Sequence, residues 1–124
     1  MKYTLITGAS KGMGLEMAHV CAAKKMNLLL VSLPNEGLEK LALSISNEYD
    51  VKTDFFETNL AVNVNTDKVY EWVLLHNYSV NFLINNAGIG GMGPFESYSP
   101  EYINNTIDIN VRATTKLSYC FIPE

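Results

Sequence analysis

A glycine-rich turn that directly follows a short apolar segment constrains the fold more than any other feature. Lys2 to Thr7 (KYTLIT) is rich in β-branched and aromatic residues, and Gly8 to Gly14 (GASKGMG) comes next. Such residues favour a strand, and closely spaced glycines favour a tight turn. Apolar residues at helical spacing follow and predict a helix from about Met13 to Lys25. The chain therefore begins as strand, turn and helix.

The same alternation of strand and helix continues to the end of the chain. Further strands are predicted at Asn27 to Ser32, Val51 to Glu57 and Val80 to Ile84. Helices are predicted from about Glu36 to Tyr49, from a cap at Asn65 or Thr66 to about Asn77, and from an N-cap at Ser99 to about Phe121, with Pro123 as a stop. The inner stripe of the last helix is predicted to be Ile103, Ile107, Asn110, Thr114, Leu117 and Phe121.

Alternating strands and helices indicate the α/β class. The pattern predicts a doubly wound, Rossmann-like parallel sheet with right-handed crossovers and helices on both faces. We expect one domain over residues 1–124, with about four strands in the order 3-2-1-4. In such a sheet the ligand site lies at the carboxyl ends of strands one and four, where the strand order reverses.

Composition and charge exclude several classes of function. The 124 residues are 48% hydrophobic and 18% charged, and the net charge of -4 gives no footprint for nucleic acid or an anionic membrane. No apolar run approaches the roughly 18 residues of a membrane span, so we expect a soluble, cytoplasmic protein. Cys21 and Cys120 are interpreted as small core residues, and His19 and His76 lack partners at ligand spacing, so no metal site is expected.

The glycine spacing itself suggests chemistry. Gly8, Gly12 and Gly14 give the pattern GxxxGxG. Glycines at such a turn let the backbone approach a pyrophosphate, whose charge is met by the N–H groups and the positive dipole at the start of the next helix. An ordinary glycine-rich turn is the alternative interpretation. A P-loop is excluded because no Gly-Lys-Ser/Thr closes the motif.

Two further motifs point to the same crevice. Asn85-Asn86-Ala87-Gly88 follows strand four, and Asp108-Ile109-Asn110-Val111 lies on the last predicted helix. Together with TGASKGMG, and in this order and spacing, they resemble the classical short-chain dehydrogenase/reductase family over essentially the whole chain. The resemblance implies an NAD(P)-dependent oxidoreductase that moves a hydride between the cofactor and an alcohol or carbonyl substrate.

The resemblance also assigns roles to residues. It implies that Thr7, Gly8, Ser10, Lys11, Gly12, Met13 and Gly14 surround the cofactor phosphates and the adenosine ribose, that Asn86, Ala87 and Gly88 line the adenosine and ribose side, and that Asn59 and Leu60 contact the adenine. Asn85 and Asn86 would also tie the sheet together through side-chain hydrogen bonds. Asn110 resembles the active-site asparagine, which bends the local helix and holds a water in the proton relay. The alternatives are a turn residue for Asn59 and a satisfied buried amide for Asn110.

The choice between the two nicotinamide cofactors is weakly encoded. An NAD enzyme usually has an acidic residue at the end of strand two, but Ser32, Leu33, Pro34 and Asn35 stand there, and we expect no acid at this place. Lys11 can pair with a 2′-phosphate, which favours NADP over NAD.

The catalytic motif of the family is missing. The family uses Tyr-x-x-x-Lys, and none of the seven tyrosines is followed by a lysine four residues later. The family's serine would lie beyond Glu124, so we expect a chain truncated before a fifth strand, which binds the dinucleotide but turns it over poorly. An unpaired fourth strand would favour a homo-oligomer. The chain is then a part of a complete dehydrogenase, a non-catalytic binding or interaction module, or a remnant that needs a partner chain.

The sequence does not identify the substrate. The loop Ile89 to Phe95, with Met92 and Phe95, is expected to border the substrate side of the cleft, and its residues indicate only an apolar surface.

Overall fold

The computed structural model describes residues 1–89 and 93–122, and its elements alternate as the sequence predicts. The strands are β1 (Lys2–Thr7), β2 (Asn27–Ser32), β3 (Thr53–Glu57) and β4 (Ser79–Ile84). The helices are α1 (Gly12–Ala23), α2 (Leu38–Tyr49), α3 (Asn63–Leu75), α4 (Pro100–Ile107) and α5 (Thr114–Phe121), with a 3-10 turn η1 (Phe95–Ser97) and a π-helical segment η2 (Asp108–Ala113). Within the described ranges, no helix combines the length and the apolar character that a bilayer span requires.

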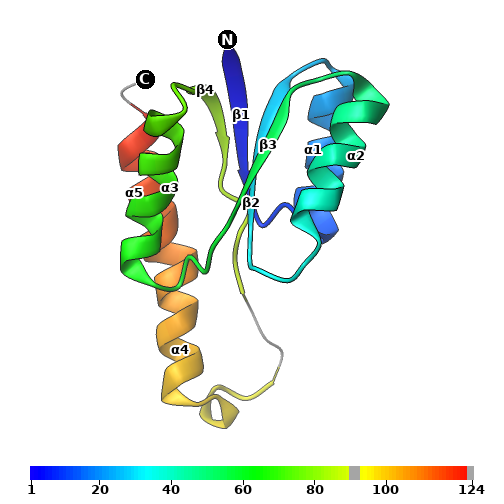
Figure 1. Ribbon diagram of the computed structural model, residues 1–124. Helices are drawn as coiled ribbons and strands as arrows, with labels where there is room; N and C mark the ends of the chain where they lie inside the picture. The colour runs from blue at the N-terminus through cyan, green and yellow to red at the C-terminus, as the bar shows by residue number, and fades with distance from the viewer. Residues whose placement is uncertain (90–92, 123–124) are drawn as a thin grey trace.

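The four strands form one parallel sheet in the order β3-β2-β1-β4, which confirms the predicted topology (Figure 1). In the register, Thr7 lies opposite Val31, and Ile6 lies opposite Ile84. The carboxyl ends of β1, β2 and β4 therefore lie at the same end of the sheet. In Figure 1 this end points downward, and α4 projects beyond it.

Helices cover both faces of the sheet. Helices α1 and α2 lie on one side in Figure 1, and α3 and α5 lie on the other. One core joins Leu5, Leu29 and Val31 to Trp72 of α3 and Leu117 of α5. The other core joins strand residues such as Ile6 and Leu30 to apolar residues of α1 and α2. Because β1 and β2 are covered on both faces, five consecutive residues of each strand are buried, rather than every second one.

The predicted N-cap of α4 is confirmed, and that of α3 is not. Ser99 is the N-cap of α4, because its Oγ accepts a hydrogen bond of 3.0 Å from the backbone N–H of Tyr102. The predicted cap of α3 at Asn65 or Thr66 is wrong, since α3 already begins at Asn63. The Asn65 side chain instead donates to the carbonyl of Asn59, and Thr66 is fully buried.

The last predicted helix runs from Pro100 to Phe121, but it contains the π-helical turn η2 in its middle. A π turn shifts the register of the residues that follow. For this reason the predicted inner stripe is partly wrong: Ile107 is 53% exposed and Asn110 is exposed, whereas Ala113, Leu117 and Phe121 are buried. Asn110, for which the resemblance implies a bend of the helix, lies within this π turn. The predicted stop at Pro123 lies outside the described residues.

An aromatic cluster closes the amino end of the sheet. The ring of Tyr78 lies 4.6 Å from that of Tyr3 and 5.9 Å from that of Trp72, measured between centroids. Its hydroxyl donates a hydrogen bond to the carboxylate of Asp54. Burial raises the pKa of Tyr78, and the hydrogen bond to Asp54 and the charge of Asp54 raise it further.

This raised pKa predicts a loss of stability at alkaline pH. The folded protein holds the Tyr78 proton more tightly than the unfolded chain, so the contribution to stability is complete below a pH of about 10 and is lost as the pH rises beyond it. We expect the free energy of unfolding to fall above this pH, and to fall less steeply in Tyr78→Phe. Urea denaturation at several alkaline pH values measures how the free energy of unfolding depends on pH. Tyr119→Phe, which changes a tyrosine that is 82% exposed, is the matched control and should follow the wild type. Equal pH slopes for the two variants would contradict the prediction.

Candidate functional site

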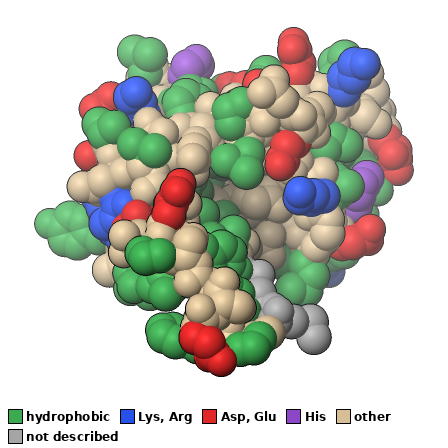
Figure 2. Space-filling model, turned by 90° about the horizontal axis from the view of Figure 1, so that it is seen from below, with side chains coloured by type: hydrophobic (Ala, Val, Ile, Leu, Met, Phe, Trp, Pro, Cys, Tyr) green, Lys and Arg blue, Asp and Glu red, His purple; other side chains and the backbone are tan. Residues whose placement is uncertain are grey.

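A pocket of about 520 Å³ opens at the carboxyl ends of the strands. Four loops line it, one after each strand, together with the inner side of the last helix. The lining residues are Gly8, Ser10, Lys11, Val31, Ser32, Leu33, Glu36, Thr58, Asn59, Leu60, Ala61, Asn86, Ala87, Gly88, Ile89, Asn105 and Ile109. Figure 2 looks onto this end of the molecule and shows the surface hollowed near its middle, with hydrophobic side chains on one side of the hollow and charged side chains on the other.

The glycine-rich loop packs tightly at one end of this pocket. Gly8 adopts a left-handed conformation with φ of +64°, and a Cβ there would lie 3.0 Å from the Cα of Ala87. A Cβ on Gly14 would lie 2.0 Å from the carbonyl oxygen of Gly8. The two glycines therefore allow the first turn of α1 to pack directly against the end of β1.

The start of α1 is uncapped and lies beside the pocket, whose lining includes the N-cap residue Lys11. Gly12 has φ of +60°, and no atom of the described residues would lie within 4 Å of a Cβ built there. In the described structure, no side chain caps the helix at Lys11, and the first turn carries no acidic residue. The N–H groups of this turn, with the positive end of the helix dipole, are thus free to bind an anionic group. These features fit a dinucleotide pyrophosphate.

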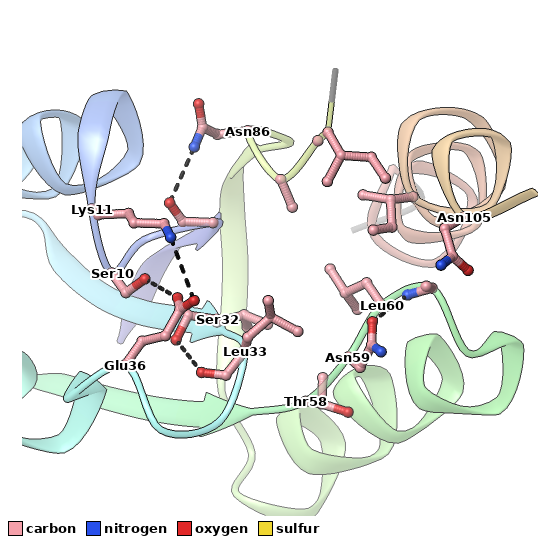
Figure 3. Close-up of a pocket in the computed structure, with 17 residues that line it drawn as sticks. Ser10, Lys11, Ser32, Leu33, Glu36, Thr58, Asn59, Leu60, Asn86 and Asn105 are labelled. Atoms are coloured by element: carbon pink, nitrogen blue, oxygen red, sulfur yellow. Dashed lines mark hydrogen bonds and ion pairs between the residues drawn. The ribbon is translucent and has the colours of Figure 1, made fainter. Parts of the chain in front are cut away.

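Hydrogen bonds fasten the end of β4 to the end of β1. The buried Oγ1 of Thr7 accepts from the backbone N–H groups of Asn86 and Ala87 at 3.1 and 2.9 Å. The Asn86 side chain donates to the carbonyl of Gly8 at 3.1 Å (Figure 3). The neighbouring Asn85 donates to Ser118 Oγ of α5 at 3.1 Å. The side chains of Asn85 and Asn86 therefore link the end of β4 to α5 and to the loop after β1.

Asn110 holds the loop after β4. Its Oδ1 accepts from the N–H of Ile89 at 2.9 Å, and its Nδ2 donates to the carbonyl of Ile89 at 2.7 Å. A Cβ on Gly88 would lie 3.0 Å from the same Oδ1. The oxygen and the nitrogen of the amide both bond to the backbone of one residue, although Asn110 itself is exposed rather than buried. This clamp joins η2 to the rim of the pocket.

Asn59 forms a local turn, and it also lines the pocket. It lines the pocket, and its Oδ1 accepts from the N–H of Ala61 at 3.0 Å, which forms a local turn. The carbonyl of Ala61 accepts from Arg112 at 2.8 Å. The loop after β3 is therefore tied to η2 as well.

Ser32 to Asn35 carry no acid, but the next residue, Glu36, is acidic and faces the pocket. Asn35 and Gly37 are both left-handed, with φ of +67° and +72°, and the chain between them turns back toward the glycine-rich loop. Glu36 consequently lines the pocket, where its carboxylate accepts a hydrogen bond from Ser10 Oγ and lies 3.6 Å from Lys11 Nζ (Figure 3). Glu36 lies one residue beyond the stretch Ser32 to Asn35 that was considered for an acidic residue.

The structure brings most of the predicted site residues together. Those that line the pocket are Gly8, Ser10, Lys11, Asn59, Leu60, Asn86, Ala87 and Gly88. The other predicted site residues do not line the pocket; they are Thr7, Gly12, Met13, Gly14 and Asn110. Met13 is 73% exposed. Of the loop predicted to border a substrate, Phe95 is 73% exposed, and Met92 lies outside the described residues.

Several lining residues were missed by the sequence motifs. Thr58, Ala61 and Glu36 follow strands β3 and β2 closely, so the rule that ligands bind beyond the carboxyl ends of the strands could have found them. Asn105 comes from α4, and nothing in the sequence pattern indicates that it faces this pocket, whereas Ile109 of η2 belongs to the Asp108–Val111 motif.

Known proteins resemble the chain along nearly its whole length. The family model described as short chain dehydrogenase matches residues 2–124. A very-long-chain 3-oxoacyl-CoA reductase from Yarrowia lipolytica is 35% identical, over 98% of this chain and 32% of its own length. The chain thus spans about a third of that curated relative.

Solved structures share the fold. The bulky-bulky ketone specific alcohol dehydrogenase from Comamonas testosteroni superimposes with a TM-score of 0.90 at 29% identity, over 99% of this chain and 49% of its own. The short-chain dehydrogenase from Sphingobium yanoikuyae, solved in complex with NADPH, has a TM-score of 0.89 at 30% identity, over 99% of this chain and 48% of its own.

Proposed function

The chain belongs to the short chain dehydrogenase family, and from this premise we propose that its pocket binds NAD(H) or NADP(H). The protein is then the dinucleotide-binding part of an oxidoreductase that moves a hydride between this cofactor and an alcohol or carbonyl substrate. One observation carries the proposal most: Lys11, the residue at the uncapped start of α1, lines the same pocket as the ends of β2, β3 and β4.

Each loop of the pocket would bind a different part of the dinucleotide. The N–H groups at the start of α1 bind the pyrophosphate, and Gly8, Gly12 and Gly14 permit its close approach. Asn59 and Leu60 would contact the adenine, and Asn86, Ala87 and Gly88 would line the adenosine and ribose side, with Thr7 holding their backbone in place. Ser10, Lys11 and Met13 complete the phosphate loop.

The bound cofactor supplies a nicotinamide ring that accepts or donates a hydride. A carbonyl substrate also needs a general acid. This chain contains no Tyr-x-x-x-Lys, so we propose that it turns over poorly by itself. The proton-relay role of Asn110 stays a prediction. Its amide holds Ile89, and so keeps the loop after β4 at the edge of the pocket.

A non-catalytic binding module, or a chain that acts only with a partner, is the alternative. The absence of the catalytic motif favours it within the 124 residues. Measurable consumption of NADPH with a panel of ketones would rule out the non-catalytic alternative. The self-association and the cytoplasmic location expected from the sequence stay predictions.

The proposal predicts binding of both halves of the dinucleotide. Isothermal titration calorimetry of the purified protein with NADH and NADPH should give a Kd of about 1 mM or below for at least one of them. AMP should compete with the dinucleotide, because it carries the adenosine and one phosphate. Heat changes indistinguishable from dilution for both dinucleotides would overturn the proposed function.

A further inference from the structure

The π-helical segment η2 holds two loops of the pocket through two of its side chains. Asn110 Nδ2 donates to the carbonyl of Ile89, in the loop after β4, at 2.7 Å. Arg112 Nη2 donates to the carbonyl of Ala61, in the loop after β3, at 2.8 Å. Side chains two positions apart in a helix do not face the same neighbour, so the two residues can hold different loops. Both Ile89 and Ala61 line the pocket.

The loop after β3 forms a continuous part of the pocket wall. Its lining residues are Thr58, Asn59, Leu60 and Ala61. Figure 3 shows Asn59 and Leu60 on the side of the pocket where Asn105 enters from α4. Two bonds fold the loop locally, since the N–H of Ala61 donates to Asn59 Oδ1 and the Asn65 side chain donates to the carbonyl of Asn59. The bond from Arg112 has a different role, because it joins this loop to the last helix.

The guanidinium of Arg112 is held in place from its own helix. Asp108 Oδ1 lies 3.0 Å from Arg112 Nη2, and the two side chains are only 32% and 28% exposed. Nη2 carries two hydrogens, so it can meet this carboxylate and the carbonyl of Ala61 together. Asp108 therefore limits the directions in which Arg112 can point.

Stability alone does not explain an arginine at this place. The second terminal nitrogen, Nη1, is buried and has no hydrogen-bond partner among residues 1–89 and 93–122. A buried donor without a partner costs free energy, which offsets part of the gain from the bond to Ala61. An apolar side chain of similar length removes this cost, so we expect Arg112→Met to change the free energy of unfolding little.

We infer that Arg112 is a positioning residue of the cofactor site: it holds the loop after β3 against η2 and thereby fixes the adenine side of the pocket. Arg112 acts through Ala61 and is not itself among the lining residues. The inference rests on the proposed function, in which Asn59 and Leu60 contact the adenine. Without Arg112, the loop gains freedom that a ligand must restrict on binding, and this weakens binding. The loop does not unfold, because Leu60 stays buried in the core.

Calorimetry with AMP, and with whichever of NADH and NADPH binds more tightly, tests the inference. Arg112→Met should raise the Kd of AMP and of the dinucleotide by the same factor of about ten, since both ligands carry the adenine. Arg112→Lys keeps a charged donor and should recover part of this loss. A residue with a merely structural role would lower the urea midpoint without changing the affinity of the folded protein.

Two further variants separate positioning from charge. Lys116 of α5 lies 2.9 Å from Asp67 and donates to Asn63, so it also links the last helix to a neighbouring element. Lys116→Met removes the same charge as Arg112→Met and should leave both Kd values unchanged. Asp108→Ala removes a negative charge, which by electrostatics alone would strengthen the binding of an anion. We expect it to weaken binding by about threefold instead, because Arg112 loses its support.

The outcomes distinguish this inference from the proposed function. Unchanged affinity in Arg112→Met, an equal loss in Lys116→Met, or tighter binding in Asp108→Ala overturns the inference while the wild type still binds the dinucleotide. Circular dichroism reports whether each variant is folded, and Arg112→Lys and Asp108→Ala decide the matter if Arg112→Met is not. Absence of binding of AMP and of both dinucleotides to the wild type overturns the proposed function, and the inference with it.

Discussion

Replacing Gly14 by alanine is expected to lower the free energy of unfolding by about 3 kcal/mol and to abolish dinucleotide binding. The added Cβ would lie 2.0 Å from the carbonyl oxygen of Gly8 and 2.7 Å from its carbonyl carbon. Both are backbone atoms, so no side chain can turn aside to relieve the clash. The start of α1 must move away from the end of β1, which separates the N–H groups proposed to bind the phosphates from the rest of the pocket.

Gly12→Ala is the control for this variant. Gly12 also has a positive φ, but a Cβ there would meet no atom of the described residues within 4 Å. Only the backbone strain of about 1 kcal/mol remains. Urea denaturation and titration with NADH measure both effects. Similar losses of stability in the two variants would contradict the role given to the Gly8–Gly14 contact.

Replacing Thr7 by valine is expected to cost about 2 kcal/mol and to weaken dinucleotide binding. Valine has nearly the same shape, but it lacks the oxygen that accepts from the N–H groups of Asn86 and Ala87. Thr7 is 1% exposed, so water cannot replace this acceptor without opening the sheet. The end of β4, with the residues that line the adenosine side, would then separate from β1.

Thr7→Ser keeps the oxygen and loses only a methyl group, so it should retain most of both the stability and the affinity. Chemical denaturation and calorimetry on the two variants distinguish the hydrogen bonds from the packing. A serine variant as weak as the valine variant would show that the methyl group, rather than the oxygen, is the important part of this side chain.

Most of the fold could be predicted from the sequence, because its signals are local or follow from general rules. The apolar runs of β1 and β2 and the helical spacing of Leu38, Ala42 and Ile45 indicate their own elements. The strand order follows from the handedness of the crossovers and from the position of the glycine-rich turn after β1. Neither step requires knowledge of a contact between distant residues.

The features that were missed all depend on such contacts. The π turn at η2 coincides with the hydrogen bonds from Asn110 to Ile89, which lies 21 residues earlier. Glu36 reaches the pocket only because two left-handed residues, Asn35 and Gly37, turn its loop back toward Ser10. Glycine suggests such a turn, but the direction in which the loop leads cannot be inferred from the composition of the loop.

The central place of β1 in the sheet has a consequence for the order of folding. This first strand pairs with β4 as well as β2, and the bond from Asn86 to Thr7 spans 79 residues. Closing so long a stretch of chain costs entropy that is recovered only when the last pairing forms, and this makes folding slow. A chain emerging during synthesis therefore leaves one side of β1 unpaired until β4 has followed, and a dinucleotide that binds as we propose would bind only chains that have completed the sheet. Such a ligand would stabilise the finished protein by mass action, but it could not serve as a template for its early folding.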